Sequence, residues 1–352
     1  MIFLEYVEKN FNYCNKKFAG FDLDFTLIKT KSGKKFPIDA NDWTWLYPNV
    51  KEIIKEIALD DSFIITIFTN QLGIDKGKTD IEELKKKFTQ IHQNLKINLI
   101  FLVADKDDNY RKPRIGMWKY LKDLGIKKEG SYYVGDAAGR IKDKNFPKDH
   151  SDSDRKFAEN LKVSFFTPEV FFIHQKNTDL EREWKYEGYR LDHNLKIKNK
   201  IKFDNKDKNI VLVAGLPGSG KSYLSKKLSK KYGFIHLSQD KDKGTIYKKI
   251  KTFIKNNNNI VVEGLFYSKS SREKILKLAD KYDKYLIKVN TDFNLSYHLN
   301  YYRYLKKGEN LIPKVVYHSY NKYYEEPQTE DYKKIINYHP RIKEKINKYY
   351  LY

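Results

Sequence analysis

Cysteine is almost absent from this sequence, and so are long apolar runs. Cys14 is the only cysteine among the 352 residues, which excludes an intramolecular disulfide and a cluster of thiolate metal ligands. The longest apolar runs, such as Phe63–Phe68, are far shorter than the ~20 residues that a membrane-spanning helix needs. The N-terminus has no basic segment followed by an apolar core, the pattern of a secretory signal. We therefore expect a soluble protein of a reducing intracellular compartment, with nucleus and cytoplasm both open.

Positive charge, by contrast, is in excess. Lys and Arg number 69 against 46 Asp and Glu, a formal net charge of +23. Such a charge favours nucleic acid or an anionic surface as a partner, but it also promotes solubility, so charge alone does not decide the function. The length predicts about two domains. A hydrophobic content of 40% indicates a globular rather than a disordered chain.

Two aspartates at the end of an apolar run form the first candidate site. The run 18–23 predicts a strand, and Asp22 and Asp24 lie two residues apart, so both side chains point to one side of it. The carboxyl end of such a strand faces the crevice where open α/β sheets bind ligands. Paired carboxylates suit Mg²⁺, and one can attack phosphorus while the other handles the proton of the leaving group. Taken alone, the pair is more often a solvated strand end or an Asx turn.

The first half of the chain alternates between strand and helix patterns. Segments with one apolar stripe predict helices at 48–59 and 81–95. Continuous apolar runs predict strands at 62–68, 99–103, 132–134 and 163–166. Repeated βαβ units of this kind imply a parallel sheet with helices on both faces.

Polar groups follow four successive strands of this half. They are Asp22 with Asp24, Thr69 with Asn70, Lys112, and Asp136. Each group alone is well explained as a strand end, a surface cation or a turn. Together they predict one site, in which Mg²⁺ lies between Asp22 and Asp136 and Lys112 balances the charge of the transferring phosphoryl group.

Further segments accompany these groups, and together they carry a resemblance. The segments are 21–24, 30–34, 42–43, 68–71, 110–113, 116–118, 134–140, 149–158 and 167–169. Their order resembles the haloacid dehalogenase superfamily, and more closely the phosphatase domain of the polynucleotide kinase 3′-phosphatase family, over residues 18–175. The resemblance implies that Asp22 is the nucleophile, Asp24 the general acid/base and Asp136 a magnesium ligand, with Asp154 a helper at the substrate. One residue departs from the pattern: Phe25 stands where the family usually has glycine, and it could narrow the mouth of the site.

A different phosphate-binding pattern opens the second half. After a buried-type strand at 210–214, residues 215–222 match G-x-x-x-x-G-K-S in full, and a helix is predicted at 223–232. In this context Lys221 reaches the β- and γ-phosphates of a nucleoside triphosphate and Ser222 holds Mg²⁺. The phosphates are cradled at the helix N-terminus by the backbone N–H groups of the loop, at Gly215, Gly218, Ser219 and Gly220.

Three polar residues further along are candidates for the transfer itself. A strand predicted at 234–240 ends in Asp240, which is placed to take a proton from an acceptor hydroxyl. The next predicted strand ends in Glu263, near a second magnesium contact. Arg303, on a helix predicted at 292–307, would stabilise charge on the transferring phosphoryl group, although a surface position explains it equally well.

Residues 208–342 resemble the kinase domain of the same bifunctional family. The likeness is carried by the P-loop, His236, Asp240, Arg272, His298, Asn300, Arg303, Glu326 and Pro327. It implies that Asp240 activates a 5′-hydroxyl, that Arg272 contacts the substrate and that Arg303 is a lid arginine. Three places depart from the family pattern: Gln239, the segment 263–266, and Tyr301, which stands where the family has another lid arginine. They bear on acceptor affinity, rate and preference rather than on ATP binding.

We therefore expect a two-domain α/β protein in which each domain has a mainly parallel sheet. The expected boundaries are a haloacid dehalogenase-like phosphatase at 1–175, a linker at 176–207 and a P-loop kinase at 208–352. The resemblance implies a bifunctional enzyme that uses Mg²⁺ and ATP. It would remove 3′-phosphates through an aspartyl-phosphate and phosphorylate 5′-hydroxyl ends, preparing strand breaks for ligation in DNA repair.

Two alternatives stay open. The kinase half could be a degenerate nucleotide- or nucleic-acid-binding module beside an active 3′-phosphatase, or both halves could act on small metabolites. DNA ends are the expected substrate, but these motifs recognise phosphate and hydroxyl groups and do not exclude RNA. The sequence begins close to the phosphatase pattern, so we expect no phosphopeptide-docking module. No membrane partner is expected, and a monomer is the default expectation.

Overall fold

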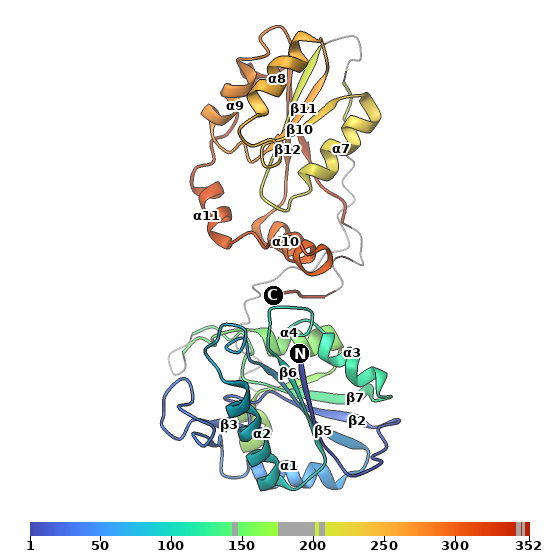
Figure 1. Ribbon diagram of the computed structural model, residues 1–352, viewed down its shortest axis with the longest axis vertical. Coiled ribbons are helices and arrows are strands. Elements are labelled where there is room, and N and C mark those ends of the chain that lie inside the picture. The colour runs from blue at the N-terminus through green and yellow to red at the C-terminus, as the bar shows by residue number, and fades with distance from the viewer. Residues whose placement is uncertain (143–146, 175–200, 204–207, 343–345, 347–348) are drawn as a thin grey trace. The chain divides into compact units, whose positions relative to one another are not determined.

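The computed structural model describes residues 1–142, 147–174, 201–203, 208–342, 346 and 349–352. The chain divides into two compact units, residues 1–187 together with 349–352, and residues 188–348. Each unit is built around its own sheet (Figure 1). The linker predicted at 176–207 lies outside the described residues except for residues 201–203.

The first unit, within its described residues, has a six-stranded sheet of order β1-β6-β5-β2-β7-β8. Only the edge strand β1 runs antiparallel to its neighbour β6, and the remaining pairs are parallel. The strands are β1 Ile2–Tyr6, β2 Lys17–Phe21, β5 Phe63–Asn70, β6 Leu99–Ala104, β7 Lys127–Val134 and β8 Ser164–Phe166. A separate pair, β3 Ile28–Lys29 and β4 Thr44–Trp45, follows β2 in the chain.

Helices cover both faces of this sheet (Figure 1). The helices are α1 Val50–Leu59, α2 Ile81–Leu95, α3 Gly116–Asp123, α4 Ser153–Leu161 and α5 Pro168–Ile173. Apolar residues of α1, α2 and α5 form one core cluster with β2 and β5, and those of α3 and α4 form another on the opposite face. The sheet is therefore buried on both sides, which explains its continuous apolar strands.

The second unit, where it is described, has a five-stranded sheet of order β10-β11-β9-β12-β13, and all its pairs are parallel. The strands are β9 Asn209–Ala214, β10 Ile235–Ser238, β11 Ile260–Gly264, β12 Asp283–Val289 and β13 Lys334–Tyr338. The helices are α7 Lys221–Tyr232, α8 Ile246–Lys255, α9 Lys269–Leu276, α10 Phe293–Lys307 and α11 Lys314–Lys322, with a 3₁₀ turn at Thr329–Asp331. Helix α7 packs on one face of the sheet, and α8 and α9 pack on the other.

Local sequence explains where several of these helices begin and end. Asp80 caps α2 by accepting a hydrogen bond from the backbone N–H of Glu82, and Asp292 caps α10 in the same way through Leu295. Gly308 ends α10 in the left-handed conformation, at φ 64°. The residues predicted for a lid thus lie on one continuous helix, α10.

The predicted fold class is confirmed: both units are α/β with mainly parallel sheets. Strands β1 and β13 were not predicted; both are short strands at the edges of their sheets, where the apolar run is brief and charged or polar residues interrupt it. Among the described residues no helix is both long enough and apolar enough to cross a membrane.

Candidate active sites of the two units

Three carboxylates meet at the carboxyl ends of two adjacent strands in the first unit. Asp22 follows β2, Asp136 follows β7, and Asp154 lies in the first turn of α4. One oxygen of each lies within 4.8 Å of the others. The backbone N–H of Asp22 donates to the Val134 carbonyl at 2.9 Å, which fixes the two strand ends side by side. Such a cluster of hard oxygen ligands fits a divalent cation such as Mg²⁺.

Lys112 is the cation at the centre of this cluster. Its side chain is 2% exposed, and its Nζ lies 2.6 Å from Asp22 Oδ1 and 2.7 Å from Asp154 Oδ1. The same ammonium donates to the Phe68 carbonyl at 2.7 Å and to the Tyr133 hydroxyl at 2.8 Å. Lys112 therefore ties the Asp22 and Asp154 carboxylates to the end of β5.

Tyr133 belongs to this network, and the sequence analysis did not predict it. Its hydroxyl donates to Asp154 Oδ1 at 3.1 Å. Gly20 lies opposite Tyr133 in the β2–β7 register, and a Cβ at Gly20 would come within 2.9 Å of the tyrosine ring. A Cβ at Gly135 would come within 2.6 Å of the Asp154 carboxylate. These two glycines therefore leave the space that the network fills, and Gly20, inside a strand, was the available signal.

Burial and charge set the protonation of the cluster. Burial, opposed by Lys112 and reinforced by Asp154, raises the pKa of Asp22 to about 7. Burial, with Asp22 and Asp154 close by, raises the pKa of Asp136 well above its usual range. For Lys112, burial acts to lower the pKa, but Asp154 and Asp22 outweigh it and the pKa is raised. Three carboxyl groups facing one lysine thus resist full ionisation, and a further cation at the site would favour their charged forms.

Asp24 lies outside the acidic cluster, although it was predicted as a metal ligand. Its Oδ2 accepts a hydrogen bond from Gln71 Nε2 at 2.8 Å, and the same Gln71 nitrogen donates to Thr69 Oγ1 at 2.9 Å. Asp154, predicted at the substrate, takes the third place in the cluster. Gln71 therefore positions Asp24, whereas Lys112 holds the carboxylates of Asp22 and Asp154.

Asn70 holds the backbone of the Lys112 segment. The Lys112 N–H donates to Asn70 Oδ1 at 2.9 Å, and Asn70 Nδ2 donates to the Lys112 carbonyl at 3.2 Å. This paired contact joins the end of β5 to the loop before α3. Both Thr69 and Asn70 are the last residues of β5 rather than residues beyond it, so their side chains are set by the strand itself.

Phe25, the departure from the family pattern, has an unusual backbone. Its φ is 61°, in the left-handed region that favours glycine, and its side chain is 44% exposed. The next residue, Thr26, accepts a hydrogen bond through Oγ1 from the Asp136 N–H at 3.1 Å. The turn that carries Phe25 thus borders the acidic cluster, and the side chain is exposed to solvent.

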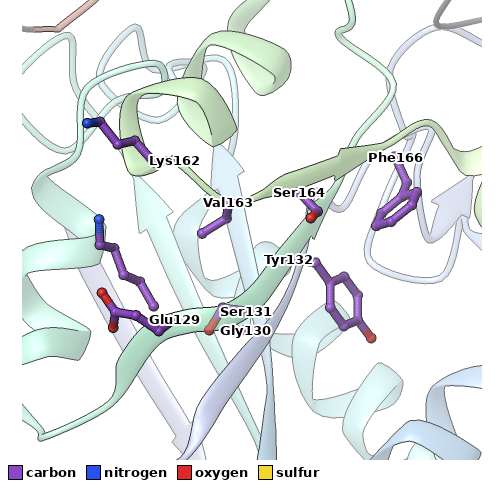
Figure 2. Close-up of a pocket in the computed structure, with 9 residues that line it drawn as sticks. Glu129, Gly130, Ser131, Tyr132, Lys162, Val163, Ser164 and Phe166 are labelled. Atoms are coloured by element: carbon purple, nitrogen blue, oxygen red, sulfur yellow. The ribbon is translucent and has the colours of Figure 1, made fainter.

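A separate hollow in this unit lies away from the acidic cluster. It has a volume of about 310 Å³ and runs along the early part of β7 and β8, where Figure 2 shows Glu129, Ser131 and Ser164. None of the residues predicted for the active site lines it.

The P-loop of the second unit connects β9 to α7. Lys221, the first residue of α7, donates to the carbonyls of Gly215 at 2.9 Å and Leu216 at 2.7 Å. Burial lowers the pKa of Lys221 to about 8, an effect that Glu263 and Asp240 oppose and Arg303 reinforces. All three residues predicted for the transfer therefore lie within electrostatic range of the P-loop lysine.

Glu263, at the end of β11, is buried beside the P-loop. Burial acts to raise its pKa, but the neighbouring His236 and Ser222 outweigh it and the pKa is lowered. His236 Nε2 lies 3.5 Å from Glu263 Oε1. The Gln239 N–H donates to the Glu263 carbonyl at 2.9 Å. Ser222 and Glu263 are thus the pair that could hold a metal ion here.

The two predicted arginines of this unit have different surroundings. Arg272 is 3% exposed and donates to the carbonyls of Phe266 at 3.0 Å and Tyr267 at 3.2 Å, so it braces the loop after β11. Together with Gly215, it also lines a cavity of about 440 Å³. Arg303 lies on α10 with its side chain 31% exposed and Nη1 3.4 Å from Glu309 Oε2.

Two residues that carried the kinase resemblance have structural partners. Asn300 donates through Nδ2 to the Ile312 carbonyl at 2.9 Å and accepts from the Ile312 N–H at 3.2 Å. His298 is fully buried, with Nε2 3.0 Å from the Ile346 carbonyl. Both residues therefore anchor α10 to later parts of the unit.

Comparison with known proteins supports one family for both units. Residues 17–172 match the family described as polynucleotide kinase 3 phosphatase. The chain is also 32% identical to the bifunctional polynucleotide phosphatase/kinase of Schizosaccharomyces pombe, over 90% of this chain and 78% of that protein. The chain belongs to this family. The predicted membership of the polynucleotide phosphatase/kinase family is therefore confirmed.

Two further relatives show how the family likeness is distributed. A putative bifunctional polynucleotide phosphatase/kinase of Acanthamoeba polyphaga mimivirus is 32% identical over 89% of this chain and 82% of its own length. The polynucleotide 3′-phosphatase of Saccharomyces cerevisiae is 32% identical over 43% of this chain and 85% of its own length. Family members named for both activities thus align with nearly the whole chain, whereas the phosphatase aligns with less than half of it.

Proposed function

We propose that this chain removes 3′-phosphates from nucleic-acid ends in its first unit and phosphorylates 5′-hydroxyl ends with ATP in its second. The observation that carries the proposal is the pair of phosphate-handling sites, each at the carboxyl edge of its own sheet. The alignment with bifunctional relatives over about 90% of the chain supports assigning both sites to one pathway of end repair.

In the first unit, Asp22 attacks the 3′-phosphate and forms an aspartyl-phosphate. Asp24, held by Gln71 at the same strand end, gives its proton to the departing ester oxygen and then takes one from the hydrolytic water. Lys112 keeps Asp22 oriented for the attack and offsets charge on the phosphoryl group. Mg²⁺ bound by Asp22 and Asp136 would stabilise the charge that develops on the phosphoryl oxygens. Asp154 orients Lys112 rather than touching the substrate directly.

In the second unit, the P-loop from Gly215 to Ser222 binds the phosphates of ATP. Lys221 contacts the β- and γ-phosphates, and Ser222 with Glu263 would hold Mg²⁺. Asp240 takes the proton of the 5′-hydroxyl as it attacks the γ-phosphate. Arg303 stabilises charge on the transferring group, which its influence on Lys221 supports.

The polymer is held mainly through its phosphates. A net charge of +23 favours binding of a polyanion, with an affinity that falls as salt rises. DNA ends are the expected substrate, in line with ligation during DNA repair. We place the phosphatase domain at 1–175, a linker at 176–207 and the kinase domain at 208–352. The division into two compact units supports this proposal, except that residues 349–352 belong to the first unit.

Matched variants test the two halves separately. Asp22→Asn should abolish release of a 3′-phosphate from an oligonucleotide and leave 5′-labelling from ATP unchanged, and Lys221→Ala should do the reverse. Release of 3′-phosphate without any 5′-labelling by the wild type would favour the degenerate kinase, for which Gln239 and the segment 263–266 are the grounds. Equal activity on sugar phosphates would contradict a role at nucleic-acid ends.

A further inference from the structure

Four residues that follow the second unit in the sequence belong to the first unit in the structure. The first unit contains residues 349–352 as well as residues 1–187. Tyr350 is 3% exposed, so its side chain is buried in the first unit. We refer to residues 349–352 as the tail segment.

The tail segment makes directional contacts with α4. The Tyr350 N–H donates to Asn160 Oδ1 at 2.8 Å, and Asn160 Nδ2 donates to the Tyr350 carbonyl at 3.0 Å. Lys156, fully buried, donates to the Tyr352 carbonyl at 2.9 Å and pairs with Asp152 at 2.7 Å. The Lys156 ammonium also lies over the rings of Tyr350 and Tyr352, at 5.7 and 5.8 Å.

A second set of contacts reaches the loop that carries Lys112. Arg114 Nη1 donates to the Leu351 carbonyl at 3.0 Å. Asn160 Nδ2, which bonds Tyr350, also donates to the Pro113 carbonyl at 2.8 Å. The tail segment therefore joins α4 to the loop immediately after Lys112.

These two elements carry the two ends of the buried ion pair in the phosphatase site. Asp154 lies in the first turn of α4, two residues before Lys156, and Lys112 lies two residues before Arg114. The distance between Lys112 Nζ and Asp154 Oδ1 is 2.7 Å. A shift of α4 against the Lys112 loop would change this distance directly, because Lys156 and Arg114 each lie only two residues from a member of the ion pair.

We propose that the tail segment, residues 349–352, is a positioning element of the phosphatase site. It clamps α4 to the Lys112 loop and so holds Lys112 between Asp154 and Asp22. The inference rests on the proposed phosphatase function. Its consequence is that residues that follow the second unit in the sequence set the rate of the phosphatase reaction without touching the substrate.

The test compares the full chain with a chain that ends at residue 348 and with Tyr350→Ala. The matched control is Lys128→Met, which removes a lysine bond of 3.2 Å to the carbonyl of Leu161 at the end of α4, away from the tail segment. Hydrogen exchange is followed by mass spectrometry over 109–116 and 153–161. Release of 3′-phosphate and 5′-labelling are measured at 15 °C, with the melting temperature recorded for each variant.

Both tail variants should exchange at least tenfold faster at 109–116 and 153–161, with α1 and α2 unchanged. Their kcat for 3′-phosphate release should fall at least fivefold with KM within twofold, while the control and all 5′-labelling keep wild-type values. Unchanged exchange would overturn the inference, and so would a lower melting temperature with unchanged kcat, which is the signature of a purely stabilising contact. A wild type inactive on every 3′-phosphate would remove the proposed function, and the exchange result would still decide whether the tail segment orders these two elements.

Discussion

Replacing Lys112 by methionine removes the only ammonium that contacts the acidic cluster among the described residues. Methionine has a similar length and no charge, so the substitution keeps the volume and deletes the charge. Asp22, Asp136 and Asp154 would then face one another within 4.8 Å without their lysine. The Phe68 carbonyl and the Tyr133 hydroxyl would lose a donor as well.

The expected cost follows from the burial of the ion pair. Removing one partner of a buried, hydrogen-bonded pair costs about 3–5 kcal/mol, because the remaining charge stays uncompensated. Part of this cost is avoided when the carboxylates bind protons. A carboxyl group whose pKa is higher in the folded than in the unfolded protein destabilises the fold at pH values above its unfolded pKa. This cost disappears as the pH falls to the unfolded pKa. The pKa of Asp22 is already about 7 and should rise further in the variant. We therefore expect a larger deficit near pH 8 than near pH 5.

Tryptophan fluorescence is a suitable signal for following the unfolding of the first unit. All four tryptophans of the chain precede the second unit in the sequence, and the three that the structure describes, Trp43, Trp45 and Trp118, lie in the first unit. Urea unfolding followed by this signal therefore reports on the first unit, and it should be measured without divalent metal at pH 5 and pH 8.

A matched control separates the buried cluster from an ordinary ion pair. Lys16 lies 2.7 Å from Asp61, but that carboxylate is 98% exposed. Lys16→Met should therefore cost much less than Lys112→Met, with little change between pH 5 and pH 8. A deficit for Lys112→Met below about 1 kcal/mol at pH 8, or one equal at both pH values, would refute the reasoning that links charge, burial and stability here.

Three further predictions concern single residues. The pKa of Lys221 is lowered to about 8, and ATP favours the charged form of this lysine. Raising the pH from 7 to 9 should therefore weaken binding of a fluorescent ATP analogue about tenfold. An affinity that does not fall with pH would contradict this. Phe25→Gly should stabilise the first unit by about 0.5–1 kcal/mol, because the left-handed backbone costs more for phenylalanine than the added freedom of glycine does; urea unfolding by tryptophan fluorescence would expose the opposite sign. Asp24→Asn keeps an oxygen for Gln71 but loses the proton carrier, so steady-state release of 3′-phosphate should fall about 10²–10⁴-fold; a loss below tenfold would mean that another group carries the proton.

The site residues that sequence could predict are those that end strands or occupy a contiguous motif. Asp22, Asp24 and Asp136 follow apolar runs, and the P-loop is one unbroken string, so local pattern was enough to find them. Tyr133 was missed because its role depends on the β2–β7 register and on the space above Gly20, which local pattern does not reveal.

Long-range contacts account for the other differences. Asp154 was placed at the substrate through the family resemblance, whereas its position in the ion pair depends on how α4 packs beside the Lys112 loop. Gln71 was noted only as a polar residue after a strand, and its bond to Asp24 spans 47 positions. The buried setting of Tyr350 depends on Asn160, 190 residues earlier, a separation at which sequence pattern predicts no pairing.

The most direct test of the bifunctional account is sealing of a nick that has a 3′-phosphate and a 5′-hydroxyl, in the presence of ATP, Mg²⁺ and a DNA ligase. Sealing needs both ends to be repaired, so the wild-type chain should permit it. Asp22→Asn should permit sealing only when the nick already has a 3′-hydroxyl, and Asp240→Asn only when it already has a 5′-phosphate. The wild-type chain could instead fail on the doubly blocked nick and also on a nick blocked only by the 3′-phosphate or only by the 5′-hydroxyl. That result would contradict the claim that one chain repairs both ends.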